Sequence, residues 1–304
     1  MTKETQKRIV VTGINGFVGK HLTRELLAND VEVIGIGQEK SAHDEIADDL
    51  DSYYSADLTK EWPVHGRIDG VIHLAGLAAV GRSFDYPQDY INLNSAMVTQ
   101  MAEYYLRTEN HSPRFVVVSS GAIYSPDQPM PLTEDSKLGI TSPYAVSKIL
   151  VENQCEYYRE VGLDCVVVRP FNHTGPGQLG GFLIPDVIAQ LQTGDEVHVG
   201  NIETKRDYTD VRDIARAYRM LALAPRLAHS TYNACSGVST QGSEIVEKLK
   251  VLTGKPDAQV VVDESKVRPT DPADIYGSSA RLREDTGWKP EISLDQTLSD
   301  CINS

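Results

Sequence analysis

The sequence has few cysteines, no apolar segment long enough to cross a membrane and a deficit of basic residues. Its four cysteines are widely spaced and include no C-x-x-C pair, which favours reduced thiols in a cytosol over disulfides or a zinc site. No stretch approaches the roughly 20 apolar residues of a membrane span. The N-terminal MTKETQKR leads into the strand-like IVVTG without an apolar signal region. We therefore expect a cytoplasmic protein with no membrane partner.

Basic residues number 29 against 43 acidic ones, so the formal net charge is −14. Nucleic-acid backbones are bound through basic patches, and this imbalance argues against a nucleic-acid partner. An anionic nucleotide ligand would need a few arginines focused locally. The eight histidines form no H-x-H or H-E-x-x-H pattern, so we predict no metal site.

Apolar runs alternate with stretches of helical periodicity along the first half of the chain. Ile9–Thr12 is a β-branched run, Phe17–Leu27 has a helical pattern and Val31–Ile36 is strand-like again, which together predict a βαβ unit. Strand-like runs and long helical stretches then alternate at Gly70–Leu74, Tyr90–Leu106, Arg114–Ser119, Tyr144–Tyr158 and Asp164–Val168. This alternation predicts an α/β fold with a Rossmann-like, doubly wound parallel sheet that helices cover on both faces.

The composition of the sequence changes after Pro170, where the segment TGPGQLGGFLIP is rich in glycine and proline. A chain of 304 residues also exceeds the usual ~100–200 residues of one domain. We predict a dinucleotide-binding domain over residues 1–172 and a smaller α/β substrate-binding lobe over most of 173–304. A segment near 207–237 combines a helical pattern with the strand-like STYNACSG, and we expect it to return to the sheet.

A glycine-rich turn joins the first strand to the first helix. The segment TGINGFVG at 12–19 follows a strand and opens a helix, which is the context of a dinucleotide fingerprint. Its glycines let the backbone approach a pyrophosphate, whose charge lies at the helix N-terminus. A tight structural turn is the alternative, but strand, helix and N-terminal position together favour cofactor binding. The predicted contacts are Gly13, Asn15, Gly16, Phe17 and Val18.

Five motifs follow one another across nearly the whole chain: T-G-x-x-G-x-x-G at 12–19, Asp57-Leu58, His73-Leu-Ala-Gly76, Ser119-Ser120 and Tyr144-Ala-Val-Ser-Lys148. Together they resemble the extended short-chain dehydrogenase/reductase family. The resemblance implies a nicotinamide-dinucleotide enzyme. It also implies further cofactor contacts, at Asp57, Leu58, Leu74, Ala75, Gly76, Ser119, Tyr144, Lys148, Pro170 and His173.

The end of the second predicted strand bears on the form of the cofactor. NAD enzymes usually carry an acid there, which binds the ribose 2′-hydroxyl, and this chain has Gly37 at that position. We therefore predict NADP(H) as the preferred cofactor, with contacts from Gln38 and Lys40, because a lysine can reach a 2′-phosphate. NAD(H) stays possible, since Glu39 could equally bind a ribose and Lys40 could simply be solvated.

Tyr144 and Lys148 are four residues apart on a helix that Ser142 and Pro143 begin, so both side chains project from one face. A tyrosine with a pKa of about 10 is a poor acid or base at neutral pH, but an adjacent ammonium and the cofactor's positive ring favour its phenolate. We predict general acid–base catalysis by Tyr144. The resemblance implies that Lys148 also binds the nicotinamide ribose and that Ser120 hydrogen-bonds the substrate oxygen. An isolated Y-x-x-x-K could instead be a core tyrosine beside an exposed lysine.

The residues that follow Ser120 help to distinguish between the activities known in this family. Its sugar-nucleotide dehydratases carry acidic residues just after the equivalent position, where this chain has Gly121 and Ala122, so elimination of water is disfavoured. Reduction of a sugar ketone and 4-epimerization with tightly bound NAD both remain open. A non-catalytic dinucleotide-sensing protein is a third reading, but such proteins typically lack the tyrosine that stands at 144.

Four segments of the second half resemble family signatures for a nucleotide-diphosphate sugar. They are RPFNHTGPGQ at 169–178, KRDYTDVRD at 205–213, RPTD at 268–271 and TGWKP at 286–290. The combination of FNHTGPGQ with RPTD most resembles GDP-4-keto-6-deoxy-D-mannose reductases, which make GDP-D-rhamnose, although those enzymes often have an acid at Ala122 and a glycine at Ser125. Arginine forks suit a diphosphate, while a salt bridge is the alternative for either arginine. The predicted substrate contacts are Ser120, Asn172, Arg206, Arg268 and Asp271.

Two further expectations concern His173 and the helices. Histidine titrates near neutrality, but we expect His173 to be a hydrogen-bonded loop residue beside the nicotinamide. The helices at Tyr90–Leu106 and Tyr144–Tyr158 carry apolar residues on more than one face, which core packing explains in part. Family members pair these two helices into an intersubunit four-helix bundle, so the resemblance implies a homodimer.

Overall fold

The fold is given by a computed structural model that describes residues 6–108, 113–267 and 272–303. Its strands are β1 (Arg8–Thr12), β2 (Glu32–Gly37), β3 (Ser52–Ser55), β4 (Gly70–His73), β5 (Arg114–Val118), β6 (Cys165–Pro170), β7 (Asn172–Thr174), β8 (Glu196–Val199), β9 (Lys205–Asp210), β10 (Thr231–Ala234), β11 (Ser239–Gln241), β12 (Gln259–Val262) and β13 (Asp274–Ile275). Its helices are α1 (Phe17–Leu27), α2 (Pro87–Thr108), α3 (Pro143–Glu160), α4 (Leu183–Thr193), α5 (Val211–Leu223), α6 (Gly242–Leu252), α7 (Ala280–Thr286) and α8 (Leu294–Ile302).

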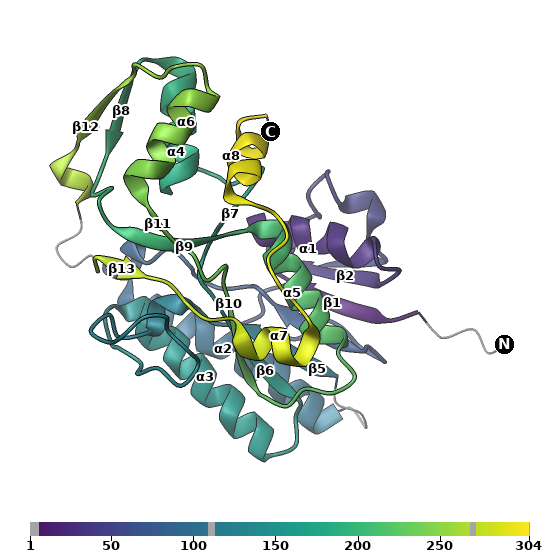
Figure 1. Cartoon of the computed structure of the whole chain (residues 1–304). Helices are drawn as coiled ribbons and strands as arrows, with labels where there is room; N and C mark the ends of the chain where they lie inside the picture. The colour runs from purple at the N-terminus through teal and green to yellow at the C-terminus, as the bar shows by residue number, and fades with distance from the viewer. Residues whose placement is uncertain (1–5, 109–112, 268–271, 304) are drawn as a thin grey trace.

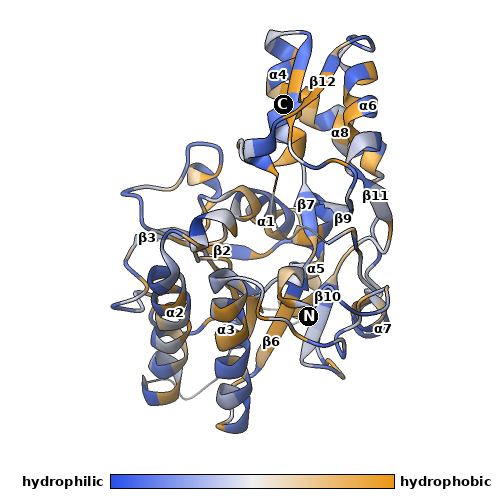
Figure 2. Cartoon of the chain, turned by 90° about the vertical axis from the view of Figure 1, so that its left-hand side faces the viewer, coloured by the Kyte–Doolittle hydropathy of each residue, from blue (hydrophilic) through white to orange (hydrophobic). Residues whose placement is uncertain are grey.

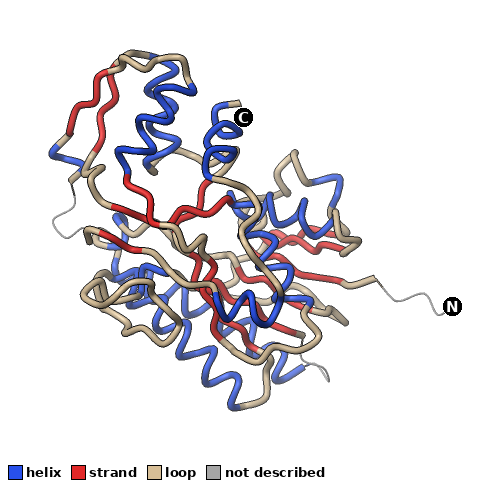
Figure 3. Tube along the Cα trace, viewed as in Figure 1, coloured by secondary structure: helices blue, strands red, loops and turns tan. Residues whose placement is uncertain are grey.

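The largest sheet has seven strands in the order β10-β6-β5-β4-β1-β2-β3. All neighbouring strands in it are parallel, and Val10 at its centre pairs with Ile34 on one side and Val71 on the other. Its inner strands are rich in β-branched residues, as expected where helices cover both faces. The predicted doubly wound α/β fold is confirmed, and Figure 3 shows the strands running between helices.

Two separate cores lie on the two faces of this sheet. On one face α1 and α5 pack together and bury Leu22 and Ile214 against the strands. On the other face α2 and α3 pack side by side and bury Met101 and Val151. Figure 2 shows α2 and α3 with mixed hydrophobic and hydrophilic surfaces, as amphipathic helices have. We call the sheet with these helices the large lobe.

The small lobe has its own core. Helices α4, α6 and α8 pack with the strand pair β8–β12 around Val187, Leu249 and Leu298. A small sheet in which β9 pairs with β7, β11 and β13 lies between this core and the large lobe (Figure 1). This small sheet therefore joins the core of the small lobe to the large lobe.

The chain crosses between the lobes more than once. After β9 it enters α5 on the large lobe and then β10, which pairs with β6 at the sheet edge. A second return, which we did not expect, brings α7 and Trp288 to the large lobe, where the indole Nε1 donates to the Asp213 carbonyl at 2.9 Å. We propose the division into residues 1–172 and 173–304 with these returns assigned to the large lobe.

Candidate functional site

The turn between β1 and α1 leaves no room for side chains. Gly13 has a φ of +68°, and a β-carbon there would lie 2.9 Å from the backbone nitrogen of Ala75. A β-carbon on Gly19 would lie 2.3 Å from the Ile14 carbonyl oxygen. Gly16 precedes α1 and supplies no side-chain cap, which leaves the first N–H groups of the helix for an anion. The turn therefore fits the pyrophosphate of a dinucleotide.

Polar side chains gather beside this turn, at the end of β2. Asn15 Nδ2 donates to Oε2 of Glu39 at 3.0 Å, and the Tyr53 hydroxyl donates to the Glu39 carbonyl at 2.7 Å. A β-carbon on Gly37 would lie 2.8 Å from the same Glu39 oxygen. Lys40 is exposed and does not line the cavity, because the chain turns outward after β2. The expected cofactor contact at Lys40 is therefore not brought to the site.

A cavity of about 2330 Å³ runs along the carboxyl ends of the large sheet and between the lobes. It brings together sixteen of the predicted cofactor contacts, namely Gly13, Asn15, Gly16, Phe17, Val18, Gln38, Asp57, Leu58, Leu74, Ala75, Gly76, Ser119, Tyr144, Lys148, Pro170 and His173. The predicted substrate contacts Ser120, Asn172 and Arg206 line it as well. Arg268 and Asp271 lie outside the described residues.

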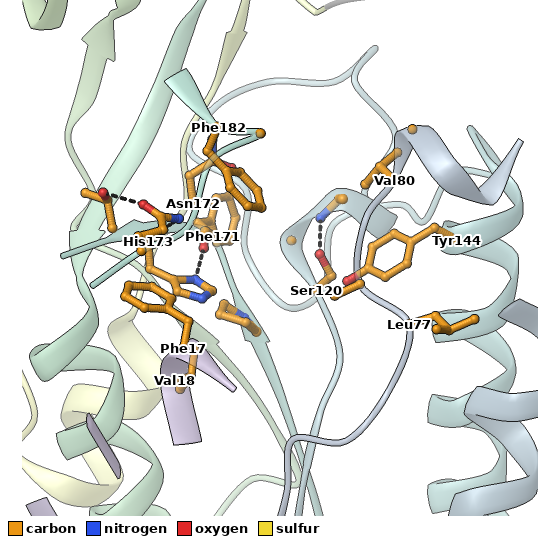
Figure 4. A pocket seen from close by; sticks show the side chains of 18 of the residues that line it. Phe17, Val18, Leu77, Val80, Ser120, Tyr144, Phe171, Asn172, His173 and Phe182 are labelled. Carbon is orange, nitrogen blue, oxygen red and sulfur yellow. Dashed lines mark hydrogen bonds between the residues drawn. The ribbon is translucent and has the colours of Figure 1, made fainter. Parts of the chain in front are cut away.

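Tyr144 and Ser120 come from different elements and meet in this cavity (Figure 4). Tyr144 lies in the first turn of α3, which Ser142 caps by accepting from the Ala145 N–H at 3.1 Å. Ser120 follows β5 and caps the short turn η3 (Gly121–Ile123), where its Oγ accepts from the Ala122 N–H at 3.1 Å. Both hydroxyl-bearing side chains line the cavity, and Ser120 is close enough to Tyr144 to lower the pKa of the phenol. A carbonyl oxygen bound here meets two hydroxyl groups at once.

Burial is the largest influence on the Tyr144 phenol. Burial raises the pKa of Tyr144, Ser120 lowers it, and the neighbouring Tyr90 raises it. We expected the Lys148 ammonium and the cofactor's positive ring together to favour the phenolate; in the protein alone, burial is the largest influence and acts in the opposite direction. The Tyr144 side chain is almost wholly buried, and a phenolate there loses the hydration that it has in water. Tyr144 is thus protonated near neutral pH and is ready to donate its proton.

Lys148 lies one turn after Tyr144 on α3 and is also buried. Its Nζ donates to the Val118 carbonyl, at the end of β5, at 2.8 Å. Burial lowers the pKa of Lys148 to about 8, and the negative Glu152 opposes that shift. A β-carbon on Gly76 would lie 3.8 Å from Nζ. This arrangement leaves the ammonium within reach of hydroxyl groups that enter from the cavity.

Asn94 of α2 is a residue of the site that the sequence analysis missed. Its Oδ1 accepts from the Leu77 N–H at 2.8 Å, and its Nδ2 donates to Ser147 Oγ on α3 at 3.0 Å. A β-carbon on Gly76 would lie 2.9 Å from Oδ1. Asn94 thus fixes the segment after β4 beside Lys148. The available signal was an asparagine among apolar residues on an amphipathic helix, because a buried amide needs hydrogen-bond partners.

His173 on β7 faces the start of α1 across the cavity. Its Nδ1 donates to the Phe171 carbonyl at 3.0 Å, and its ring lies parallel to that of Phe17 with centroids 6.4 Å apart. Burial lowers the pKa of His173, so the ring is neutral near pH 7. A neutral, hydrogen-bonded ring fits an orienting role better than proton transfer.

Arg206 reaches the cavity from β9 of the small lobe. Its Nη1 donates to the carbonyls of Pro272 at 2.8 Å and Lys205 at 2.6 Å. The next residue, Asp207, is buried and accepts from the Ser236 N–H at 2.8 Å. Arg206 therefore projects from a strand that is fixed on both sides.

Apolar side chains lie on two sides of the reacting hydroxyls. Leu77 and Val80 lie near Tyr144, whereas Phe171 and Phe182 lie on the other side of Ser120, beside Asn172 and His173 (Figure 4). A β-carbon on Gly121 would lie 3.0 Å from the Phe171 ring, so an acidic side chain has little room there.

Three general findings complete the site. Within the described ranges, no group of three or more His, Cys, Asp or Glu residues is placed to hold a metal ion. Across the same residues, none of the helices has both the length and the apolar character needed to span a membrane. All four cysteines lie in the described ranges and none of them forms a disulfide there; Cys155, Cys165 and Cys235 are buried.

Comparison with known proteins identifies relatives of the whole chain. The sequence profile of the NAD dependent epimerase/dehydratase family matches residues 9–235. GDP-6-deoxy-D-mannose reductase from Pseudomonas aeruginosa is 34% identical, over 96% of this chain and 95% of the relative. The structure of RMD from the same organism, complexed with NADPH, has a TM-score of 0.81 at 31% identity and covers 98% of both chains.

An epimerase is similar in structure too. UDP-glucose 4-epimerase from Thermotoga maritima with UDP-glucose has a TM-score of 0.86 at 27% identity and covers 97% of both chains. The predicted resemblance to the extended short-chain dehydrogenases/reductases is confirmed. The chain belongs to the NAD dependent epimerase/dehydratase family and is an oxidoreductase-type enzyme with a nicotinamide-dinucleotide site.

Proposed function

We propose that this enzyme reduces the 4-keto group of a nucleotide-linked 4-keto-6-deoxy sugar, and that the reaction is GDP-4-keto-6-deoxy-D-mannose to GDP-D-rhamnose. The observation that carries the proposal is that Tyr144 and Ser120 lie together in a cavity that also contains the glycine turn. The relative at 34% identity, a GDP-6-deoxy-D-mannose reductase, supports the choice of sugar.

The chain's own residues account for the proton in this reaction. The reduced cofactor, when bound, supplies a hydride to the carbonyl carbon. Ser120 donates a hydrogen bond to the carbonyl oxygen, and Tyr144 transfers its proton to that oxygen as the C=O bond becomes an alcohol. The raised pKa of Tyr144 keeps the proton available for this step. Lys148 then stabilises the phenolate that is left.

The shape of the site supports a deoxy sugar. Leu77 and Val80 lie beside Tyr144, and apolar side chains accommodate a methyl group better than a hydroxymethyl group, whose hydroxyl would lose its hydrogen bonds. The two residues that follow Ser120 are Gly121 and Ala122, and neither is acidic. Elimination of water, which needs a further acid and base, is therefore disfavoured.

NADP(H) is our proposed cofactor, supported by the glycine at 37 and by the NADPH in the reductase structure. NAD(H) is the second candidate, because the Glu39 carboxylate lies over Gly37. A carboxylate at that place binds a ribose hydroxyl and repels a 2′-phosphate. We therefore predict that the relative affinity for NADP(H) and NAD(H) depends on Glu39.

A 4-epimerase with tightly bound NAD is the alternative activity, favoured by the likeness to UDP-glucose 4-epimerase. An epimerase oxidises and re-reduces the same carbon, so it turns over without added reduced cofactor. A sensing protein without catalysis is the other alternative. The pairing of Tyr144 with Ser120 argues against it.

We also propose a homodimer in a reducing, cytoplasmic setting. The adjacent helices α2 and α3 expose Leu106, Leu150 and Tyr157, and a second copy would cover such a face. Free, largely buried thiols are usual in a reducing compartment. Light scattering on the purified protein tests the dimer.

The decisive experiment offers the purified enzyme GDP-4-keto-6-deoxymannose with NADPH and follows the loss of near-ultraviolet absorbance. Parallel reactions use the dTDP- and UDP-linked analogues, and NADH replaces NADPH in each. Oxidation with the GDP-linked ketone is the expected result. No oxidation with any analogue would remove the reductase proposal, and interconversion of 4-epimers without added cofactor would establish the alternative.

A further inference from the structure

A buried ion pair lies behind the reacting centre. Arg169 on β6 and Glu152 on α3 make a two-point contact, with Nε to Oε1 at 2.9 Å and Nη2 to Oε2 at 2.6 Å. Their side chains are only 7% and 11% exposed, and neither residue lines the cavity. Burial removes hydration from both charges, so stability alone is a weak reason for placing an ion pair here.

The same guanidinium contacts the loop that carries Ser120. Its Nη1 donates to the Tyr124 hydroxyl at 2.8 Å, and its carbon lies 5.0 Å from the centre of the Tyr124 ring. Tyr124 follows directly on the η3 turn that Ser120 caps. The Tyr124 hydroxyl in turn donates to Oδ1 of Asn233 on β10 at 2.6 Å. The Ser120 turn is thus held to two strands of the large sheet.

Glu152 connects this network to the other half of the site. It lies one helical turn beyond Lys148 and two turns beyond Tyr144 on α3. Arg169 therefore contacts both of the elements whose relative position sets the distance between Ser120 and Tyr144. A further bond from Nη1 to the Glu134 carbonyl, at 3.1 Å, holds the outer part of the same loop.

We propose that Arg169 is a positioning residue, which keeps Ser120 in place against Tyr144 by binding Tyr124 and Glu152 together. The inference rests on the proposed function, because it gives the network a part in the same reaction. A planar guanidinium has five donors in a fixed fork, whereas a lysine ammonium cannot reproduce the two-point contact and the bond to Tyr124 together. A misplacement of about 1 Å at a reacting centre can cost roughly 100-fold in rate.

The test compares Arg169→Lys with a matched control, Arg216→Lys. Arg216 is 17% exposed, pairs with Asp213 and Glu291, and does not line the cavity. We expect R169K to lower kcat roughly 10- to 100-fold while KM and cofactor affinity change less than about threefold. R216K should leave kcat within about twofold of the wild type. Equal losses in both variants, or a parallel loss of cofactor binding in R169K, overturn the proposal.

A second measurement needs no sugar substrate. In Glu152→Gln the partner of Arg169 keeps its shape but loses the charge that opposes the lowered pKa of Lys148; burial and Cys155 are the other influences on that pKa. Carbon-13 NMR of labelled lysines follows Lys148, assigned through Lys148→Met. We expect its pKa to fall below the wild-type value of about 8. An unchanged titration overturns the link through Glu152, whereas a wild-type enzyme that reduces no sugar overturns only the proposed function.

Discussion

The glycine turn of the large lobe and the small lobe present different surfaces to the cavity. At the glycine turn the backbone forms the surface, since Gly13 and Gly19 have no space for a β-carbon. On the small lobe the surface is made by side chains such as Phe182 and Arg206. A backbone surface fits what all dinucleotides share, while side chains select among sugars and nucleobases. The difference explains how similar folds include both a GDP-6-deoxy-D-mannose reductase and a UDP-glucose 4-epimerase.

The largest expected effect comes from a substitution that removes the proton donor and leaves the surfaces of both lobes intact. Tyr144→Phe should lower kcat about 100- to 10,000-fold, because the phenol supplies the proton. Cofactor affinity, measured by fluorescence quenching, should change little, since the ring still fills its place. Retained turnover would refute the acid–base role of Tyr144.

The backbone surface is tested by Gly13→Ala. The new methyl group would lie 2.9 Å from the Ala75 nitrogen at a φ of +68°, so the turn must shift. We expect cofactor affinity to fall at least about tenfold, and the free energy of unfolding to fall by about 1–3 kcal/mol. Gly254→Ala is the control, because Gly254 has a φ of +74° with open space around it. If both variants lose cofactor equally, close approach at Gly13 is not the cause.

The side-chain surface is tested by Arg206→Lys. The charge stays but the fork is lost, so the KM for the nucleotide sugar should rise roughly three- to tenfold while cofactor affinity is unchanged. Arg219→Lys, which alters an ion pair with Glu25 away from the cavity, should leave KM unchanged. An unaltered KM in R206K would move Arg206 out of the predicted substrate contacts.

Glu39→Gln has the smallest expected effect. It tests a side chain that lies beside the glycine turn, where the backbone otherwise forms the surface of the cavity. Loss of the carboxylate over Gly37 should strengthen NADPH binding relative to NADH by roughly two- to fivefold, as expected for a partly exposed charge. The ratio of the dissociation constants for NADPH and NADH measures this change in preference. Glu61→Gln is the control, because Glu61 is exposed. A constant ratio would show that Glu39 does not meet the ribose.

The large lobe was predictable because its elements are local and periodic. The helix expected at Phe17–Leu27 has those bounds in the structure, and the strand runs fall within about two residues of the observed ones. The order of the motifs also indicated the cavity residues, since the ends of parallel strands meet at one edge. The catalytic neighbourhood of Tyr144 followed from a spacing of four on one helix.

The remainder depended on contacts between distant segments. Asn94 and the Arg169 network join residues that no local pattern relates. The direction of the Tyr144 pKa depended on burial, which the spacing of Lys148 did not reveal. Lys40 does not line the cavity, and its contact with the cofactor stays a prediction, because the spacing of residues after a strand does not fix the direction of a loop.

The repeated crossing of the chain between the lobes has a consequence for evolution and engineering. Elements α5, β10 and α7 return to the large lobe between stretches of the small one. A single recombination point after residue 172 would remove the edge strand β10 and the helices α5 and α7 from the large lobe. A functional chimera must therefore exchange several separate insertions at once. In this architecture, point substitutions in the loops are an easier route to a changed sugar specificity than recombination of whole segments.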